Sequence, residues 1–128
     1  MKTIYIGHSR SFDYEHELYE PVRQLQLDEN IKIILPYEKE GEHVKTKELF
    51  QKDCDLFIAE VSYPATGLGM ELAYADIFEV PIICFFKSGS KISGSIKGVT
   101  NNFVEYVDIN DLQMKLSDEI NRECLNKF

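Results

Sequence analysis

The chain has 128 residues, a hydrophobic content of 44% and a formal net charge of −8. This length fits a single core, so we expect residues 1–128 to form one domain. No apolar run approaches the ~20 residues that a membrane span needs, and the negative charge disfavours a nucleic acid polymer as partner, because binding to the phosphate backbone depends on clustered Lys and Arg.

Short apolar runs alternate with helical patterns along the chain. The predicted strands are Thr3–Gly7, Ile31–Leu35, Leu56–Val61, Pro81–Phe86 and Phe103–Val107. The N-terminal apolar segment is too short and too soon interrupted for a secretory signal, so we interpret it as the first strand. The three cysteines are an odd number with no paired spacing, so we expect free thiols in a reducing cytoplasm.

Four helical patterns accompany these strands. In the first, Leu18, Val22 and Leu25 recur at spacings of four and three, as on one face of a helix, and Asp13 is the expected cap. The other helices are expected at Val44–Lys52, at Gly67–Phe78, and along the four-residue repeat from Leu112 to Cys124 with Asn110 as cap.

This alternation predicts an α/β fold in which right-handed crossovers place helices on both faces of a parallel sheet. We expect a three-layer sandwich with five strands in the order 2-1-3-4-5. Ligands of open α/β sheets bind where the strand order reverses, here between the first and third strands. The segments that would meet there are Gly7–Ser9 and Val61–Tyr63.

The segment TGLGMELAYA, residues 66–75, begins just beyond the third strand. A glycine inside a helix costs about 1 kcal/mol relative to alanine, so Gly67 and Gly69 suggest that a ligand approaches the backbone there. Glu71 follows Gly67 by one helical turn and is a candidate nucleophile that the helix N-terminus would keep ionised. Tyr5 could lend it a hydroxyl. The alternatives are that Glu71 complements the helix dipole and that Tyr5 is a core aromatic.

Other chemistries fit the sequence less well. The glycine pattern lacks the third glycine of a dinucleotide fingerprint and follows the wrong strand. The histidines at 8, 16 and 43 form no metal-ligand pair, so we expect no metal site. Ser88–Ser95 is either a flexible loop or an anion cradle helped by Lys91 and Lys97.

The sequence resembles the nucleoside 2-deoxyribosyltransferase family, which includes the 2′-deoxynucleoside 5′-phosphate N-hydrolases. The resemblance covers the start TIYIG, the strand CDLFIAEV, the turn GLGMEL, the run PIICFF and the loop SGSKISGSIKG. It implies a flavodoxin-like fold and cleavage or transfer at the N-glycosidic bond of nucleosides or their 5′-monophosphates, without a metal or organic cofactor.

The resemblance also implies roles for individual residues. Glu71 would attack C1′ of the sugar and form a covalent ester, and Tyr5 would assist it. Ser9 and Ser93 would hold a 5′-phosphate, with Ser93 coming from a neighbouring subunit of at least a homodimer. Gly7, Gly67 and Gly69 would complete the substrate-binding site.

Two positions depart from the family pattern. An aspartate that handles the base in the helix before the third strand falls on Lys47, with Glu48 beside it. A serine or aspartate just before the glycine turn is replaced by Ala65, for which Thr66 is a possible substitute. These departures support a second hypothesis, a non-catalytic nucleotide-binding or sensing module on the same fold.

Overall fold

The computed structural model describes residues 1–39 and 43–125. Within them, five parallel strands form one sheet. They are β1 (Lys2–His8), β2 (Ile31–Ile34), β3 (Leu56–Glu60), β4 (Ile82–Lys87) and β5 (Phe103–Tyr106). Their order is β2-β1-β3-β4-β5, which confirms the topology expected from the sequence.

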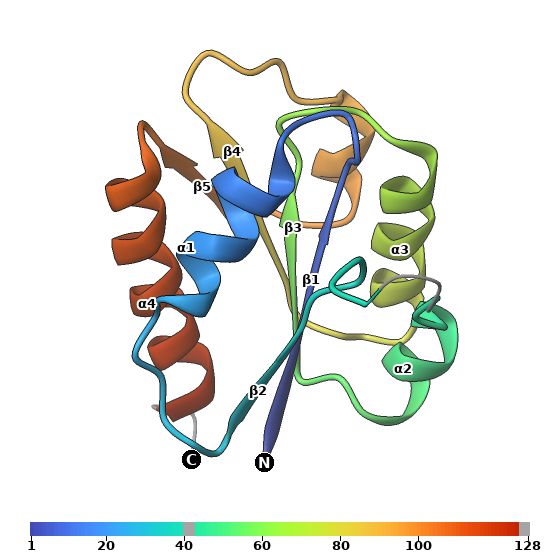
Figure 1. Cartoon of the computed structure of the whole chain (residues 1–128). Coiled ribbons are helices and arrows are strands. Elements are labelled where there is room, and N and C mark those ends of the chain that lie inside the picture. The colour runs from blue at the N-terminus through green and yellow to red at the C-terminus, as the bar shows by residue number, and fades with distance from the viewer. Residues whose placement is uncertain (40–42, 126–128) are drawn as a thin grey trace.

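Helices cover both faces of the sheet (Figure 1). A π-helical turn, η1 (Glu15–Tyr19), continues into α1 (Glu20–Arg23), and α1 and α4 (Ile109–Leu125) cover one face. On the other face lie α2 (Thr46–Lys52) and α3 (Thr66–Ile77), and a 3₁₀ turn, η2 (Gly94–Gly98), follows β4. The three-layer α/β sandwich is therefore confirmed.

Side chains alternate between the two faces of each strand, as the period of two requires. Ile4 and Ile6 of β1 lie in the core formed with α4, whereas Tyr5 lies in the core formed with α2 and α3. The alternation directs Gly7 toward the α2 and α3 side and His8 toward the η1 side. Gly7 and His8, although adjacent in the sequence, therefore lie toward opposite faces of the sheet.

The first helix is less regular than the spacing of Leu18, Val22 and Leu25 predicts. Pro21 has no N–H to donate, and the chain before it adopts the wider π-helical turn, in which the N–H of Glu20 donates to the carbonyl of Glu15. The α-helical part then ends at Arg23. Leu25 still packs against the core but lies beyond the helix.

The last helix begins with a different cap from the one expected. Asp108, not Asn110, accepts the N–H of Asp111, at 2.8 Å. Asp111 in turn accepts the N–H of Val107 at 2.9 Å, so the two aspartates close the helix start reciprocally. Asn110 lies inside the first turn. Three of the four residues at 108–111 are polar, and their spacing alone does not identify which of them caps the helix.

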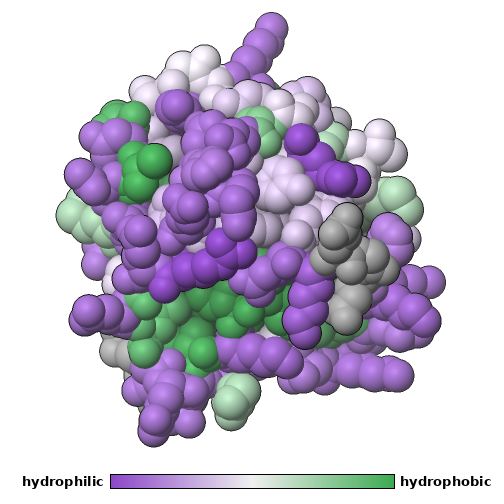
Figure 2. All heavy atoms as spheres, viewed as in Figure 1, coloured by the Kyte–Doolittle hydropathy of each residue, from purple (hydrophilic) through white to green (hydrophobic). Residues whose placement is uncertain are grey.

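The face seen in Figure 2 is mostly hydrophilic, and a hydrophobic area lies between α1 and β2. There, partly buried side chains pack against the core, namely Leu25, Leu27, Ile31 and Ile33. No helix among the described residues has the length and apolar character required to cross a bilayer. The cysteines are free thiols; Cys84 and Cys124 are buried and Cys54 is partly buried.

Candidate active site

The carboxyl ends of β1 and β3 lie side by side at the point where the strand order reverses. In the register of the two strands, Gly7 is beside Ala59 and His8 is beside Glu60. The chain leaves β1 toward η1 and leaves β3 toward α3, on opposite faces of the sheet (Figure 1). This divergence is the geometry that opens ligand crevices in such sheets.

Tyr5 and Glu71 meet beside this point. The hydroxyl of Tyr5 donates to Oε2 of Glu71 at 2.5 Å. The Tyr5 ring is 1% exposed and packs against Phe50 and Phe57, with ring centroids 5.6 Å away in both cases. Tyr5 is therefore both a core aromatic and the partner of the carboxylate, so the two interpretations of its position are compatible.

Gly7 makes room for this carboxylate. A Cβ at Gly7 would lie 2.8 Å from Oε1 of Glu71 and 2.8 Å from the ring of Phe57. Both distances are below ordinary contact, so a larger residue would displace either side chain. The sequence placed Gly7 among the substrate-binding residues, whereas the structure gives it a direct contact with Glu71 itself.

Glu71 differs from expectation in its charge. Burial raises its pKa to about 7, although hydrogen bonds from Tyr5 and Thr46 act in the opposite direction. The helix N-terminus was expected to keep the carboxylate ionised, and that expectation is wrong because desolvation outweighs the favourable groups. Near neutral pH the side chain is a mixture of the acid and the carboxylate.

The helix α2 presents Thr46 to this carboxylate. Lys47 and Glu48, the two positions considered for a base-handling acid, are both exposed. Phe50, one turn after Thr46, packs on Tyr5, so the inward face of α2 is fixed by Thr46 and Phe50. No second carboxylate is among the described groups that shift the pKa of Glu71.

The glycines of α3 leave open space. A Cβ at Gly67 or Gly69 would meet nothing within 4 Å. Gly69 also lines a pocket of about 180 Å³ between α3 and the loop after β4. The side chains that line this pocket include Tyr63, Leu68, Leu72, Lys91, Ser93 and Ser95, but not Glu71. The structure therefore does not bring Ser93 and Glu71 into one pocket.

Ser9 is 2% exposed and its hydroxyl already has partners. Its Oγ accepts the N–H of Ser11 at 3.0 Å and lies 2.8 Å from the Ser11 hydroxyl. Ser11, which sequence reasoning passed over, is exposed. A ligand would have to displace this turn to reach Oγ of Ser9, whereas the Ser11 side chain is accessible.

Sequence reasoning also passed over a buried acid, Glu60, at the end of β3. It is 1% exposed and accepts hydrogen bonds from the Tyr106 hydroxyl, the Ser62 N–H and the Ser62 hydroxyl. Burial raises its pKa. The signal was present in the sequence, because an acid inside an otherwise apolar run has to be paired once it is buried.

Among the described residues, no group of three or more His, Cys, Asp or Glu side chains is arranged as metal ligands. The polar groups around Glu71 are hydroxyls, which are hydrogen-bond donors to a carboxylate. The arrangement is thus a partly buried carboxylate oriented by hydroxyl groups, beside an open helical turn.

Comparisons with known proteins agree with this fold. No protein-family model matches the chain. A relative from Thermofilum pendens, named "Putative 2'-deoxynucleoside 5'-phosphate N-hydrolase 1", is 35% identical over 81 residues, which are 55% of this chain and 57% of the relative. The 5-hydroxymethyl-dUMP N-hydrolase of Tetraodon nigroviridis is 34% identical over 71 residues, 48% of this chain and 50% of the relative. The chain thus spans about half the length of these curated relatives.

Solved structures share the fold at lower identity. The CMP N-glycosidase BcmB of Clostridium botulinum has a TM-score of 0.63 at 15% identity, covering 90% of this chain and 98% of that one. The 2-desoxiribosyltransferase of Leishmania mexicana has a TM-score of 0.55 at 22% identity, covering 75% and 77%.

The fold and the buried carboxylate define an α/β protein of flavodoxin-like topology with a candidate site at its switch point. Together with the named relatives, they confirm the resemblance to the nucleoside 2-deoxyribosyltransferase family and its N-hydrolases.

Proposed function

We propose that this protein cleaves or transfers at the N-glycosidic bond of nucleosides or their 5′-monophosphates, with Glu71 as the nucleophile. The observation that carries the proposal is the hydrogen bond from Tyr5 to Glu71 at the sheet's switch point. The sequence relatives, which are named as N-hydrolases, support the substrate class.

The proposed reaction has two displacements. A carboxylate oxygen of Glu71 attacks C1′ as the bond from C1′ to the base nitrogen breaks, and the departing base takes the electron pair and then a proton. Water next attacks C1′ and loses a proton to solvent, or a nitrogen of a second base attacks it. In either case the bond from C1′ to Glu71 breaks and the carboxylate is released. Two inversions retain the configuration, as in retaining glycosidases. Tyr5 holds the carboxylate in one orientation, and Gly67 and Gly69 leave space for the sugar.

No described carboxylate contributes to the shifted pKa of Glu71, so we place protonation of the leaving base on solvent. A reaction without a positioned general acid depends strongly on how well the base leaves. We therefore expect the rate of base release to rise steeply along a series of deoxynucleotides with increasingly acidic bases. A flat dependence would indicate a general acid and would contradict this part of the proposal.

The central test is to follow free base by chromatography across a panel of deoxynucleosides and their monophosphates. A competing free base distinguishes transfer from hydrolysis. Glu71→Ala should abolish release, whereas the exposed control Glu48→Ala should retain it. Release at an unchanged rate in Glu71→Ala would overturn the nucleophile assignment.

A non-catalytic nucleotide-binding module is the second candidate. Thr46 stands where a base-handling acid would face Glu71, and Ala65, at the start of α3, makes no side-chain cap. Nucleotide binding without base release from any substrate would favour this candidate. Binding of none of them would contradict both functions.

We also propose that the protein acts as a homodimer in which α3 contacts a second copy. The helix buries Leu68 and Leu72 inside its own chain, yet its other side exposes Met70 (51%) and Ile77 (69%). Helices that are apolar all round are covered on both sides. A second copy could also bring its Ser93 to Glu71, which the pocket within one chain does not do.

Light scattering at micromolar concentration tests this assembly. We expect a dimer for the wild type and a monomer for Met70→Lys, with Met114→Lys, an exposed methionine on α4, as the matched control. A monomeric wild type would contradict the dimer. The free thiols, two of them buried, support a reducing cytoplasm as the setting of the reaction.

A further inference from the structure

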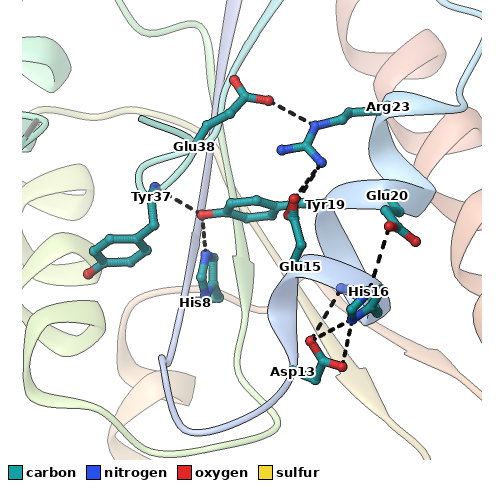
Figure 3. A network of polar contacts seen from close by, with 9 residues as sticks. All are labelled: His8, Asp13, Glu15, His16, Tyr19, Glu20, Arg23, Tyr37 and Glu38. Carbon is teal, nitrogen blue, oxygen red and sulfur yellow. Dashed lines mark hydrogen bonds and ion pairs between the residues drawn. The ribbon is translucent and has the colours of Figure 1, made fainter. Parts of the chain in front are cut away.

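A series of three hydrogen bonds connects the segments that follow β1 and β2, and Figure 3 shows the two that involve Tyr19. His8, at the end of β1, is 4% exposed. Its Nδ1 lies 2.7 Å from the carbonyl oxygen of Ser9, and its Nε2 lies 2.6 Å from the hydroxyl of Tyr19. The same hydroxyl accepts the backbone N–H of Tyr37 at 3.1 Å.

The direction of each bond follows from the groups involved. The carbonyl of Ser9 can only accept, so Nδ1 of His8 carries the proton. In the neutral ring Nε2 is then the acceptor, and the Tyr19 hydroxyl donates to it. Because Tyr19 oxygen still accepts from Tyr37, every donor in the series has an acceptor.

These three hydrogen bonds hold in place two segments that border the candidate site. One is the turn at Ser9 and Ser11, whose hydroxyls contact each other and whose Ser11 side chain is exposed. The other is the Tyr37 segment, residues 37–39, which lies close enough to the site that, beyond the effect of burial, Tyr37 contributes to the raised pKa of Tyr5. His8 itself points to the opposite face of the sheet, so it has no contact with the carboxylate.

The surroundings of His8 favour the neutral ring. Burial lowers its pKa, as does the nearby charge of Arg10, while the bond to Ser9 acts in the other direction. Aromatic rings surround it: those of Phe12, Tyr14, Tyr19 and Tyr37, with centroids 4.7–5.9 Å away. Its register neighbour on β3, Glu60, is engaged with Tyr106 and Ser62.

We propose that His8 is a positioning residue whose neutral imidazole, through Tyr19, fixes the Ser9–Ser11 turn and the Tyr37 segment so that they bind the 5′-phosphate of the substrate. This inference rests on the proposed function, because it concerns how the same site holds its ligand. Protonation would turn Nε2 from an acceptor into a donor and leave the Tyr19 hydroxyl without its acceptor. The Ser9–Ser11 turn and the Tyr37 segment would then be held less firmly.

The test breaks the series at two points. Tyr19→Phe removes only the hydroxyl, and His8→Asn keeps a donor for the Ser9 carbonyl but no longer reaches Tyr19. We expect each variant to bind dCMP about tenfold more weakly by calorimetry, the size of one lost hydrogen-bond link. Binding of deoxycytidine, which lacks the phosphate, and the kcat at saturation should be unchanged.

Two controls separate positioning from general loss of structure. His16→Gln alters an exposed histidine that is paired only with acids on its own turn, and should leave binding unchanged. The double variant should bind no more weakly than either single variant, because both break the same series. Additive losses, or a loss of deoxycytidine binding equal to that of dCMP, would overturn the inference.

A second measurement does not depend on any ligand. By ¹⁵N NMR, His8 should be neutral with its proton on Nδ1 at pH 7, and the amide signal of Tyr37 should follow the titration of His8 in the wild type but not in Tyr19→Phe. A Tyr37 signal indifferent to that titration in the wild type would contradict the coupling. If the wild type binds no deoxynucleoside or monophosphate of the panel, the proposed function fails. If it binds dCMP no more tightly than Tyr19→Phe does, only this inference fails.

Discussion

Two glutamates, one buried and one partly buried, lie toward the carboxyl edge of the sheet, and each is hydrogen-bonded to a tyrosine from a strand. Glu60 faces the side of the sheet covered by α1 and α4, and Glu71 reaches the other side from α3. Glu60 has three donors, from Tyr106 and Ser62, and is 1% exposed. Glu71 keeps part of its surface open beside the turn that contains Gly67.

The two carboxylates differ in how many hydrogen-bond donors each one has. Burial raises both pKa values, so both groups would cost free energy as isolated charges. Glu60 offsets that cost with donors from Ser62 and Tyr106, and Ser62 in turn accepts the N–H of Lys87 on β4. Its network ties three strands together. Glu71 has fewer donors, which leaves a carboxylate that a ligand can still engage.

The largest expected effect is on stability at Glu60. Glu60→Ala leaves the Tyr106 hydroxyl and both Ser62 donors without an acceptor and opens a cavity, so we expect a loss of about 3 kcal/mol in the free energy of unfolding. Glu71→Ala should change it by less than about 1 kcal/mol at pH 8, because it also removes a poorly solvated charge. Urea unfolding measures both, and equal losses would contradict the comparison.

The next effect has opposite signs at the two sites. The folded-state pKa of Glu71, about 7, lies above its ordinary value of 4.5. Between these values the folded state holds more protons than the unfolded state, so stability falls as the pH rises through this range. Glu71→Gln avoids that cost and should stabilise the protein by about 2 kcal/mol at pH 8.5, with little change at pH 4.5. Glu60→Gln should destabilise it at both pH values, because an amide nitrogen cannot accept from Tyr106 or Ser62.

Urea unfolding of both glutamine variants at the two pH values provides the measurement, and Glu48→Gln on the exposed face of α2 is the control. A Glu71→Gln variant that is no more stable than the wild type at pH 8.5 would show that ionised Glu71 does not destabilise the folded protein.

The sequence predicted the topology because strands and helices alternate and the glycine turn marks the switch point. It also paired Tyr5 with Glu71, since a residue in the first strand and one in the helix after the third strand face the same space in this topology. These are consequences of connectivity and period. They do not depend on the detailed packing of the side chains.

The features of the site that the sequence did not predict depend on how side chains pack. The pKa of Glu71 is set by burial against Tyr5 and neighbouring side chains, which no local pattern specifies. The orientation of α2, which selects Thr46 over Lys47, follows from Phe50 packing on Tyr5. The engagement of Ser9 with Ser11 is a property of one turn, and nothing in the spacing of the serines predicts it.

A smaller effect separates close approach from open space. Gly7→Ala places a Cβ against Glu71 and Phe57, and we expect a loss of about 1–2 kcal/mol. Gly69→Ala adds a Cβ in open space inside a helix and should stabilise by up to about 1 kcal/mol. Combining Gly7→Ala with Glu71→Ala should recover part of the loss. Urea unfolding checks all three, and a full loss in the double variant would assign the clash to Phe57 alone.

The smallest effect concerns the pH dependence of base release. If ionised Glu71 is the nucleophile, kcat/KM should rise as the pH passes about 7, where the carboxylate forms. Tyr5→Phe removes a donor that lowers the pKa of Glu71, so the rising limb should move to higher pH by about half a unit to one unit. Tyr106→Phe removes the corresponding hydroxyl from Glu60 and should leave the limb in place while lowering stability.

The pH profile of kcat/KM for the two phenylalanine variants, measured where both remain folded, therefore compares the pairs directly. The two hydroxyls occupy similar positions relative to a buried glutamate, so a shift confined to Tyr5→Phe assigns the titration to Glu71. A limb that moves equally in both variants would mean that the titrating group senses the whole edge of the sheet. A limb that moves to lower pH in Tyr5→Phe would require Tyr5 to favour the protonated acid, contrary to the direction of its hydrogen bond.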